Sequence, residues 1–243
     1  MPYSTGFNYA DQYHMPATLT APPDALLLLT SQCPQCPTVL QGLSELVKKG
    51  IIGRLEAVNI MARPEIARQY GVRSVPWILI GEFELEGMHS PAELQQWARR
   101  ASTETGLSDY YADLLKNGQL PKALNIVNRK PDHLPALFQL AADPDTELTV
   151  RIGVSAVIEH FAGDDKLLRE LPALIELANN GDPRVRSDAS HFLALTHSAD
   201  AVKILEQLTR DTEAAVRHVA QDSLEELREH LSDAEHRPQS DQQ

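Results

Sequence analysis

Apolar and polar residues follow two different patterns along the chain, and the change from one to the other lies near residue 102. Before that point, short apolar runs and alternating segments predict strands at 25–30, 53–60, 77–80 and 83–86. Apolar residues at helical spacing predict helices between and after them, at 38–49, 64–70 and 91–101. From residue 106 onward only helical spacing remains. We therefore expect an α/β domain followed by an all-α domain.

The predicted domain boundaries follow from this change of pattern. A polar lead-in at 1–23 precedes the α/β domain at 24–101. A linker and first helix at 102–117 lead to paired helices at 118–231. The remaining residues, 232–243, are polar, and we expect them to form a disordered tail.

The only two cysteines, Cys33 and Cys36, lie between the first predicted strand and the first predicted helix. A thiolate at that position gains free backbone N–H groups and the positive end of the helix dipole, which lower the thiol pKa. Pro34 suits the first helical turn because its missing N–H is not needed there. Strand, Cys-Pro-Gln-Cys and helix together predict a redox dithiol, with Gln35 as the fourth motif residue. The alternatives are inert core cysteines or half of a zinc site, for which no further cysteine exists.

Two separate features carry a family resemblance. They are the dithiol after the first strand, and a Val-Pro pair some forty residues later, before the third strand. With the order β-α-β-α-β-β-α, residues 24–101 resemble the thioredoxin and glutaredoxin fold. Two shorter stretches, Gly81-Glu82-Phe83 and Gly87-Met88, resemble the sequences of two thioredoxin-fold groups. These groups are the protein disulfide oxidoreductases and the dithiol domain of alkyl hydroperoxide reductase flavoprotein subunits.

The resemblance implies roles for five residues. Cys33 is expected to attack a substrate disulfide, and Cys36 to resolve the mixed disulfide, leaving a Cys33–Cys36 disulfide. The bond between Val75 and Pro76 is expected to be cis and to lie against the dithiol. In the family, the main chain of the residue at the position of Val75 pairs with the substrate. Trp77 is expected to support this substrate groove.

Two positions depart from the thioredoxin pattern. Gln32 stands just before the motif, where thioredoxin usually has tryptophan. Leu27 stands six residues before Cys33, where thioredoxin has a buried aspartate that helps to deprotonate the second cysteine. The acids that remain as candidates for this task are Glu45, Glu84 and Glu86.

The second half of the chain contains an internal repeat. A Val-Arg pair recurs at intervals of 35 and 31 residues, as Val150-Arg151, Val185-Arg186 and Val216-Arg217. Each pair begins a predicted helix, and second helices are predicted at 167–177 and 201–208. A period of this length with paired helices is typical of an α-solenoid.

The phrase Asp-Pro-x-Val-Arg at residues 182–186 resembles the HEAT-like repeat family, over roughly residues 118–231. In that family an aspartate and an arginine commonly link neighbouring repeats. The resemblance assigns this structural role to Asp182, paired with Arg151, Arg186 or Arg217.

Charge and composition limit the possible partners. Residues 106–243 carry 14 Lys and Arg against 24 Asp and Glu, so this half should repel nucleic acid and anionic membranes. Its seven histidines form no metal-binding motif, and we predict neither a metal nor an organic cofactor. No apolar segment reaches the length of a membrane span, and we find no secretory signal. These features predict a cytoplasmic protein with a reversible disulfide.

These observations predict a thiol–disulfide oxidoreductase that acts in cell redox homeostasis, with a HEAT-like domain for binding protein partners. The expected partners are a protein client and an electron donor, which is either a reductase or a small thiol. The alternative is a non-catalytic adaptor, in which the helical repeats act as an assembly scaffold and the dithiol serves as a redox sensor.

Overall fold

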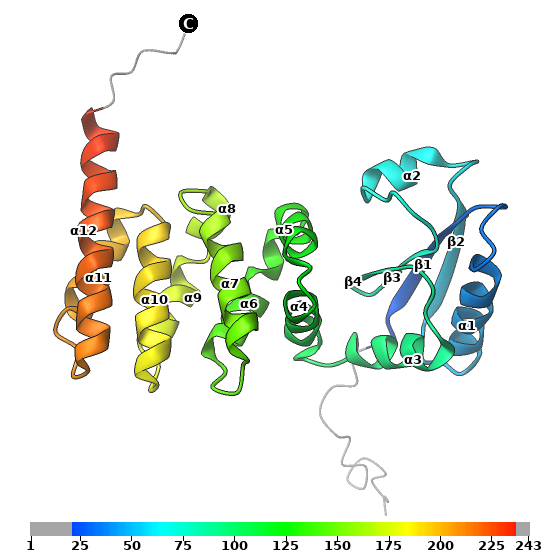
Figure 1. Ribbon diagram of the computed structural model, residues 1–243, viewed down its shortest axis with the longest axis horizontal. Helices are drawn as coiled ribbons and strands as arrows, with labels where there is room; N and C mark the ends of the chain where they lie inside the picture. The colour runs from blue at the N-terminus through cyan, green and yellow to red at the C-terminus, as the bar shows by residue number, and fades with distance from the viewer. Residues whose placement is uncertain (1–20, 237–243) are drawn as a thin grey trace, which may run out of the picture. The chain divides into compact units, whose positions relative to one another are not determined.

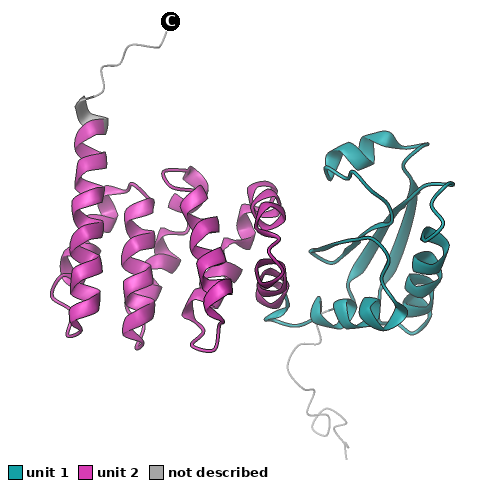
Figure 2. Ribbon diagram, viewed as in Figure 1, with its two compact units in different colours: residues 1–106 teal, residues 107–243 magenta. Residues whose placement is uncertain are grey.

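The computed structural model describes residues 21–236, and the chain divides into two compact units that meet at Gly106 and Leu107 (Figure 2). The first unit contains all the strands of the described chain, and the second is helical, so the expected fold class is confirmed. The greater part of the lead-in, residues 1–20, lies outside the described residues.

The first unit has the predicted element order β-α-β-α-β-β-α (Figure 1). Its elements are β1 Asp24–Leu29, α1 Cys36–Lys48, β2 Arg54–Asn59, α2 Pro64–Gln69, β3 Trp77–Ile80, β4 Phe83–Glu86 and α3 Pro91–Arg100. The strands form one sheet in the order β2-β1-β3-β4. β1 and β2 are parallel because α1 returns the chain to the same end of the sheet, whereas β3 and β4 are antiparallel to their neighbours.

The two faces of this sheet contact different helices. Phe83 lies on the same face as Leu27, and its ring is 5.6 Å from that of Trp97 on α3. α1 contacts α3 and therefore covers this face as well. Trp77 lies on the other face, where its ring is 5.0 Å from that of Tyr70 at the end of α2. α1 and α3 thus cover one face of the sheet, and on the other face the end of α2 contacts Trp77 through Tyr70.

A glycine allows α1 and α3 to approach closely. A Cβ atom on Gly42 would lie 3.0 Å from Cδ1 of Leu94, which is completely buried on α3. α3 itself begins with a capping box, in which Ser90 and Glu93 bind each other's backbone N–H groups. This cap and this contact fix α3, and through it α1, against the sheet.

The second unit is built from helices in two layers. The elements are α4 Gly106–Lys116, α5 Leu120–Arg129, the short 3₁₀ helix η1 Pro131–His133, α6 Leu134–Ala142, α7 Leu148–His160, α8 Asp165–Leu168, α9 Leu171–Ala178, α10 Pro183–Leu195, α11 Ala199–Leu208 and α12 Ala214–His236. Figure 1 shows α7, α10 and α12 side by side in one layer, with α6, α9 and α11 forming the other. The valine of each Val-Arg pair is buried between these layers, at Val150, Val185 and Val216.

Two boundaries differ from the sequence prediction. The single helix expected at 167–177 is two helices, α8 and α9, because Pro172 must lie in the first turn of a new helix. The last helix continues to His236, beyond the predicted end of the repeats at residue 231, and residues 237–243 lie outside the described part of the chain.

The repeat arginines are paired differently from the expectation. Asp182 caps α10, since its Oδ1 accepts the N–H of Arg184 at 2.8 Å, and it therefore faces its own helix. Arg186 pairs with Asp211 through two hydrogen bonds, with Nε 2.7 Å from Oδ2 and Nη2 2.9 Å from Oδ1. Arg151 instead reaches Asp188 on α10 at 3.3 Å.

Two of the repeat arginines, Arg186 and Arg217, close the loop that precedes their helix. Arg186 donates from Nη1 to the carbonyl oxygens of Asn180 and Gly181, at 2.8 and 3.1 Å. Arg217 repeats this contact one period later, donating from Nη1 to Asp211 and Thr212 at 2.7 and 2.9 Å. In the second and third Val-Arg pairs a buried valine thus stands next to an arginine that binds carbonyls five and six residues earlier, whereas Arg151 of the first pair binds Asp188.

We expect Arg186→Ala to lower the free energy of unfolding by roughly 2–3 kcal/mol, because it leaves the carboxylate of Asp211 shielded and unpaired. Arg228→Ala is the matched control. It also breaks an ion pair between helices, with Glu206, but both side chains are about half exposed, and we expect a loss of no more than about 0.5 kcal/mol. Urea unfolding followed by circular dichroism measures both values, and equal losses would contradict the assigned role of Asp211.

The same ion pair predicts a dependence of stability on pH. The hydrogen bonds from Arg186, with help from the N–H of Glu213, lower the pKa of Asp211 from 3.8 to about 2. A lowered carboxyl pKa stabilises the fold fully above the unfolded value of 3.8, and this contribution is lost as pH falls through about 2. The stability difference between the unsubstituted protein and Asp211→Asn should therefore shrink by about 2 kcal/mol between pH 5 and pH 1.5. A constant difference in urea unfolding over this range would exclude this linkage.

Candidate functional site

The dithiol lies in the loop between β1 and α1. Cys33 is half-buried in this loop, whereas Cys36 is buried as the first residue of α1, and the two are joined by a disulfide. Pro34 precedes the helix, so its expected place in the first turn is wrong. Pro37 occupies that turn instead, and Gln35 is the N-cap residue without a side-chain hydrogen bond.

The sulfur of Cys33 faces the beginning of α1. The backbone N–H of Cys36 donates a hydrogen bond to Sγ of Cys33 at 3.2 Å. The first turn of α1 contains no acidic residue that would offset the positive end of its dipole. The N–H of Cys33 is itself bound to the carbonyl oxygen of Thr30 at 3.3 Å. Because the dipole acts mainly within the first turn, this geometry stabilises negative charge on the sulfur of Cys33 more than on a side chain farther along α1.

The Val75–Pro76 segment lies at the same edge of the sheet as the dithiol. β3 begins at Trp77, opposite Leu28 at the end of β1, so the segment before β3 lies beside the loop that follows β1. The Val75–Pro76 bond is cis. Val75 is half-buried, while Pro76 and Trp77 are buried, and the carbonyl oxygen of Pro76 accepts the N–H of Gly87 at 2.9 Å.

The main chain of Val75 has free hydrogen-bonding groups. Among the described residues, neither its N–H nor its C=O takes part in a backbone hydrogen bond, because strand pairing begins only at Trp77. Buried backbone groups are normally paired, and an unpaired peptide group beside a groove can bind an extended segment of another chain.

The three candidate acids occupy three different environments. Glu45 lies nine residues along α1 from Cys36, roughly 13 Å away, and its hydrogen bond from Lys48 lowers its pKa at the surface. Glu86 is exposed at the end of β4. Glu84 is the buried one, but its position on β4 places it on the opposite face of the sheet from Leu27. None of the three therefore stands where the family places its buried acid.

Three residues near the dithiol were missed by the sequence analysis. Asn59 ends β2, and its amide Nδ2 donates to the hydroxyl of Ser31 at 3.1 Å, while its Oδ1 accepts the N–H of Met61 at 2.9 Å. Met61 and Met88 are both strongly exposed in loops that follow strands. The sequence does place both methionines shortly after predicted strands, β2 and β4. A methionine belongs to no chemical motif, however, so nothing else in the sequence identifies them as site residues.

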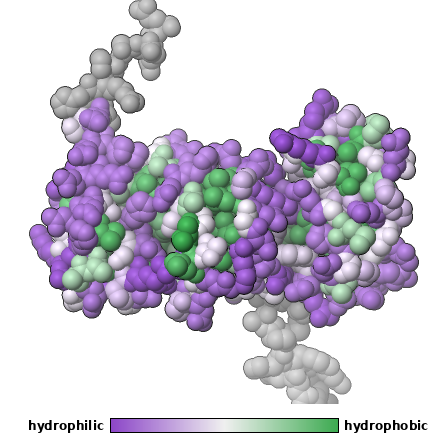
Figure 3. Space-filling model, in the orientation of Figure 1, coloured by the Kyte–Doolittle hydropathy of each residue, from purple (hydrophilic) through white to green (hydrophobic). Residues whose placement is uncertain are grey.

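A groove of about 260 Å³ lies between α7 and α10 in the second unit. Its apolar side is formed by Leu148 and Ile152, whose side chains lie one helical turn apart and are more than 60% exposed. Figure 3 shows hydrophobic residues gathered on this face of α7 amid a hydrophilic surface. The polar side is formed by Glu159 and by the paired Arg151 and Asp188.

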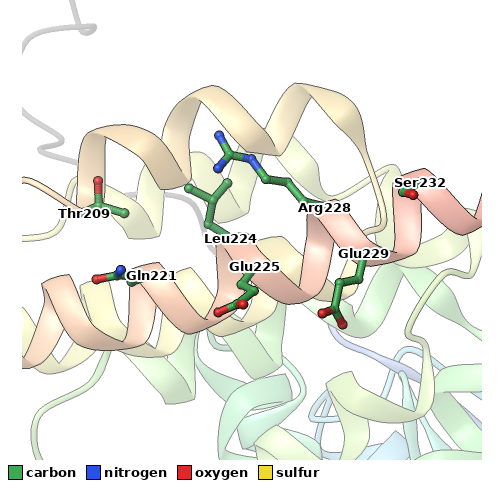
Figure 4. Close-up of a pocket in the computed structure, with 7 residues that line it drawn as sticks. All are labelled: Thr209, Gln221, Leu224, Glu225, Arg228, Glu229 and Ser232. Carbon is green, nitrogen blue, oxygen red and sulfur yellow. The ribbon is translucent and has the colours of Figure 1, made fainter.

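A larger groove of about 810 Å³ follows α12 and the end of α11 (Figure 4). Figure 4 shows Glu225 and Glu229 projecting from α12 one turn apart. Arg228, which also lines this groove, is neutralised by an ion pair with Glu206 at 2.6 Å. The groove is therefore acidic, with Leu224 as its one large apolar side chain.

Two histidines of the second unit, His197 and His230, contact each other. The rings of His197 and His230 are stacked at 4.1 Å, and His191 lies 3.2 Å from Glu159. Burial, followed by the nearby charge of His230, lowers the pKa of His197. Within the described part of the chain, no three His, Cys, Asp or Glu side chains are grouped closely enough to hold a metal ion.

A search of curated proteins finds no match to the chain. No helix among residues 21–236 is both long enough and apolar enough to cross a membrane. Residues 25–99 match the family model described as a thioredoxin domain, and residues 134–225 match the one described as HEAT repeats. The chain thus carries a thioredoxin domain followed by HEAT repeats, the combination that its motifs predict.

Proposed function

We propose that this protein is a thiol–disulfide oxidoreductase in which Cys33 is the nucleophile and Cys36 the resolving thiol. The observation that carries the proposal is the asymmetry of the dithiol. Cys33 is half-buried and its sulfur accepts a hydrogen bond from the N–H of Cys36, whereas Cys36 is buried at the start of the helix. After reduction, that N–H and the dipole of α1 stabilise a thiolate on Cys33, which is the reactive form.

The reaction proceeds by two exchanges. The Cys33 thiolate attacks one sulfur of the client disulfide, forms a mixed disulfide, and releases the other client sulfur as a thiolate. Cys36 then loses its proton and attacks the sulfur of Cys33, which releases the second client thiolate and forms the Cys33–Cys36 disulfide. Two electrons from a reductase or a small thiol restore the dithiol, and no metal or organic cofactor takes part.

The free peptide groups of Val75 support client binding beside the dithiol. A client segment that pairs with them adds a short extended strand at this edge, and the buried Pro76 and Trp77 hold that edge in place. The client sulfur then lies beside Cys33, which stands in the neighbouring loop after β1. Main-chain pairing of this kind accepts many sequences, because side chains contribute little to it.

We assign client recruitment to the HEAT repeats. Their groove between α7 and α10 exposes Leu148 and Ile152, and exposed neighbouring apolar side chains of this size are typical of protein-binding surfaces. The acidic charge of this half of the chain disfavours nucleic acid and anionic membranes as partners. A client held by the repeats has a raised effective concentration near Cys33 in the same chain.

Titration and trapping test the catalytic proposal. We expect the Cys33 thiol in Cys36→Ser to titrate at least one pH unit below the value of about 8.5 for a free cysteine. The same variant should accumulate client mixed disulfides, because the resolving thiol is missing, and mass spectrometry of the trapped species identifies the client.

Cys33→Ser is the matched control, since it keeps Cys36 but removes the nucleophile. It should form no mixed disulfide and no longer reduce insulin. An ordinary thiol pKa together with unchanged partner binding in Cys33→Ser would favour the adaptor with a redox-sensing dithiol.

A second substitution tests recruitment. Ile152→Glu places a charge in the groove between α7 and α10, and we expect the yield of trapped client in the Cys36→Ser background to fall about tenfold. Leu168→Glu is the control, since Leu168 is an exposed leucine on α8 that does not line this groove. Equal yields from both variants, each normalised to its reaction with dithionitrobenzoate, would remove this groove from the proposal.

A further inference from the structure

Two exposed apolar side chains of the first unit stand out because they share one edge of the sheet. Among its described residues, the large hydrophobic side chains that are exposed belong to Met61, at 75%, and Met88, at 59%. Single exposed apolar residues are common on protein surfaces, but both of these lie in loops at the edge that carries Cys33. Their common location therefore calls for a physical explanation.

The order of the strands places the methionines on opposite sides of the dithiol. Met61 follows β2, and Met88 follows β4, while the Cys33 loop and the Val75–Pro76 segment belong to the two strands between them. β2 runs parallel to β1, so both strands end at this edge, and β4 ends beside the beginning of β3. Along this edge the order is therefore Met61, Cys33, Val75–Pro76 and Met88.

Hydrogen bonds fix both methionine loops to their neighbours. Asn59 joins the turn of Met61 to the loop of Cys33, since it binds Ser31 with its amide and the N–H of Met61 with its oxygen. On the other side, Gly87 donates its N–H to Pro76 at 2.9 Å and so holds Met88 beside that segment. The methionine backbones thus have defined positions, while their side chains stay flexible enough to fit different apolar partners.

The distance between β2 and β4 determines how long a client segment this edge can bind. β2 and β4 are separated by three strand spacings, which is about 14 Å. An extended chain advances about 3.4 Å per residue, so it crosses this distance in about four residues. Side chains two positions apart in such a chain point to the same side. Cys33 follows β1, so it lies about one strand spacing, or 5 Å, from β2 and about two spacings, or 10 Å, from β4. Residues two positions before and after a client cysteine lie about 7 Å from it and face the same side, within reach of long methionine side chains on both sides.

We propose that Met61 and Met88 are specificity-determining residues that bind apolar side chains two positions before and two positions after the cysteine of the client. This inference rests on the proposed oxidoreductase function. The exposed residues next to Cys33 in the sequence agree with it, because they are uncharged, namely Ser31, Gln32, Pro34 and Gln35. The selected client segment is extended and apolar on the face that carries the sulfur.

Activated peptides test this proposal with the full-length Cys36→Ser protein. Each probe is a nine-residue peptide whose central cysteine forms a mixed disulfide with thionitrobenzoate. The Cys33 thiolate attacks the peptide sulfur, a new protein–peptide disulfide forms, and the coloured thionitrobenzoate anion leaves. One peptide has leucine two positions before and after its cysteine, a second has asparagine there, and a third has leucine at the two adjacent positions instead.

We expect the first peptide to react about tenfold faster than the other two, since it alone buries apolar area against both methionines. In the double variant Met61→Asn, Met88→Asn, this advantage should fall to about twofold or less. Met61→Leu, Met88→Leu should restore it because leucine supplies similar apolar area, and Leu168→Asn on the second unit should leave it unchanged. Each rate is divided by the rate of the same variant with dithionitrobenzoate.

Two different failures are distinguishable. Equal rates for the three peptides, with normal reactivity toward dithionitrobenzoate, would overturn the role of the methionines and leave the oxidoreductase proposal intact. The same holds if the tenfold advantage persists in the asparagine double variant. If Cys33 reacts with neither the peptides nor dithionitrobenzoate, the oxidoreductase proposal fails, and this inference fails with it.

Discussion

The antiparallel pairing of β3 with β1 is the constraint on which the candidate site depends. It places Trp77 opposite Leu28, and so brings the segment before β3 beside the loop that follows β1. The sulfurs and the peptide groups of Val75 come from positions about forty residues apart, and no local interaction could hold them together. The buried apolar row formed by Leu27, Ile78 and Leu85 fixes this alignment, because a shift of one residue would turn these side chains to the other face.

A different interaction organises the second unit. The repeats bury a valine at the start of α7, α10 and α12, and before α10 and α12 the adjacent arginine also closes the preceding loop. Where Arg186 also meets Asp211, one side chain connects the loop before α10 with the loop before α12. Stability in such an array comes from contacts between neighbours, so the loop connections matter as much as the helices. The outer residues of α7 are exposed and do not belong to the core, so this face of the helix is available for binding a partner.

Much of this could be predicted from the sequence, because strong local signals agreed with the fold. The apolar run of β1, the dithiol before a helical pattern, and the Ser90-Pro91 cap each follow from short-range physics. The missed features depend on contacts between distant segments. The sequence shows that Asp182 begins a helix. It does not show that the carboxylate of Asp182 is used to cap that helix, so that Arg186 pairs with Asp211 instead. Likewise, Met61 and Met88 become neighbours of the dithiol only when the strand order is known. Pro172 indicates a break between α8 and α9, but the apolar spacing continues across it and favours a single helix.

The two sulfurs also differ in the backbone that carries them. Cys36 belongs to the hydrogen-bonded ladder of α1, so any displacement of it would disturb a helix that packs on the sheet and on α3. Cys33 stands in irregular backbone, where its own N–H is bound to Thr30 and its loop is joined to Asn59. Local opening is easiest where few hydrogen bonds hold the chain. When the disulfide is reduced, Cys33 is therefore free to move with the loop at residues 30–35, whereas movement of Cys36 would require α1 to open.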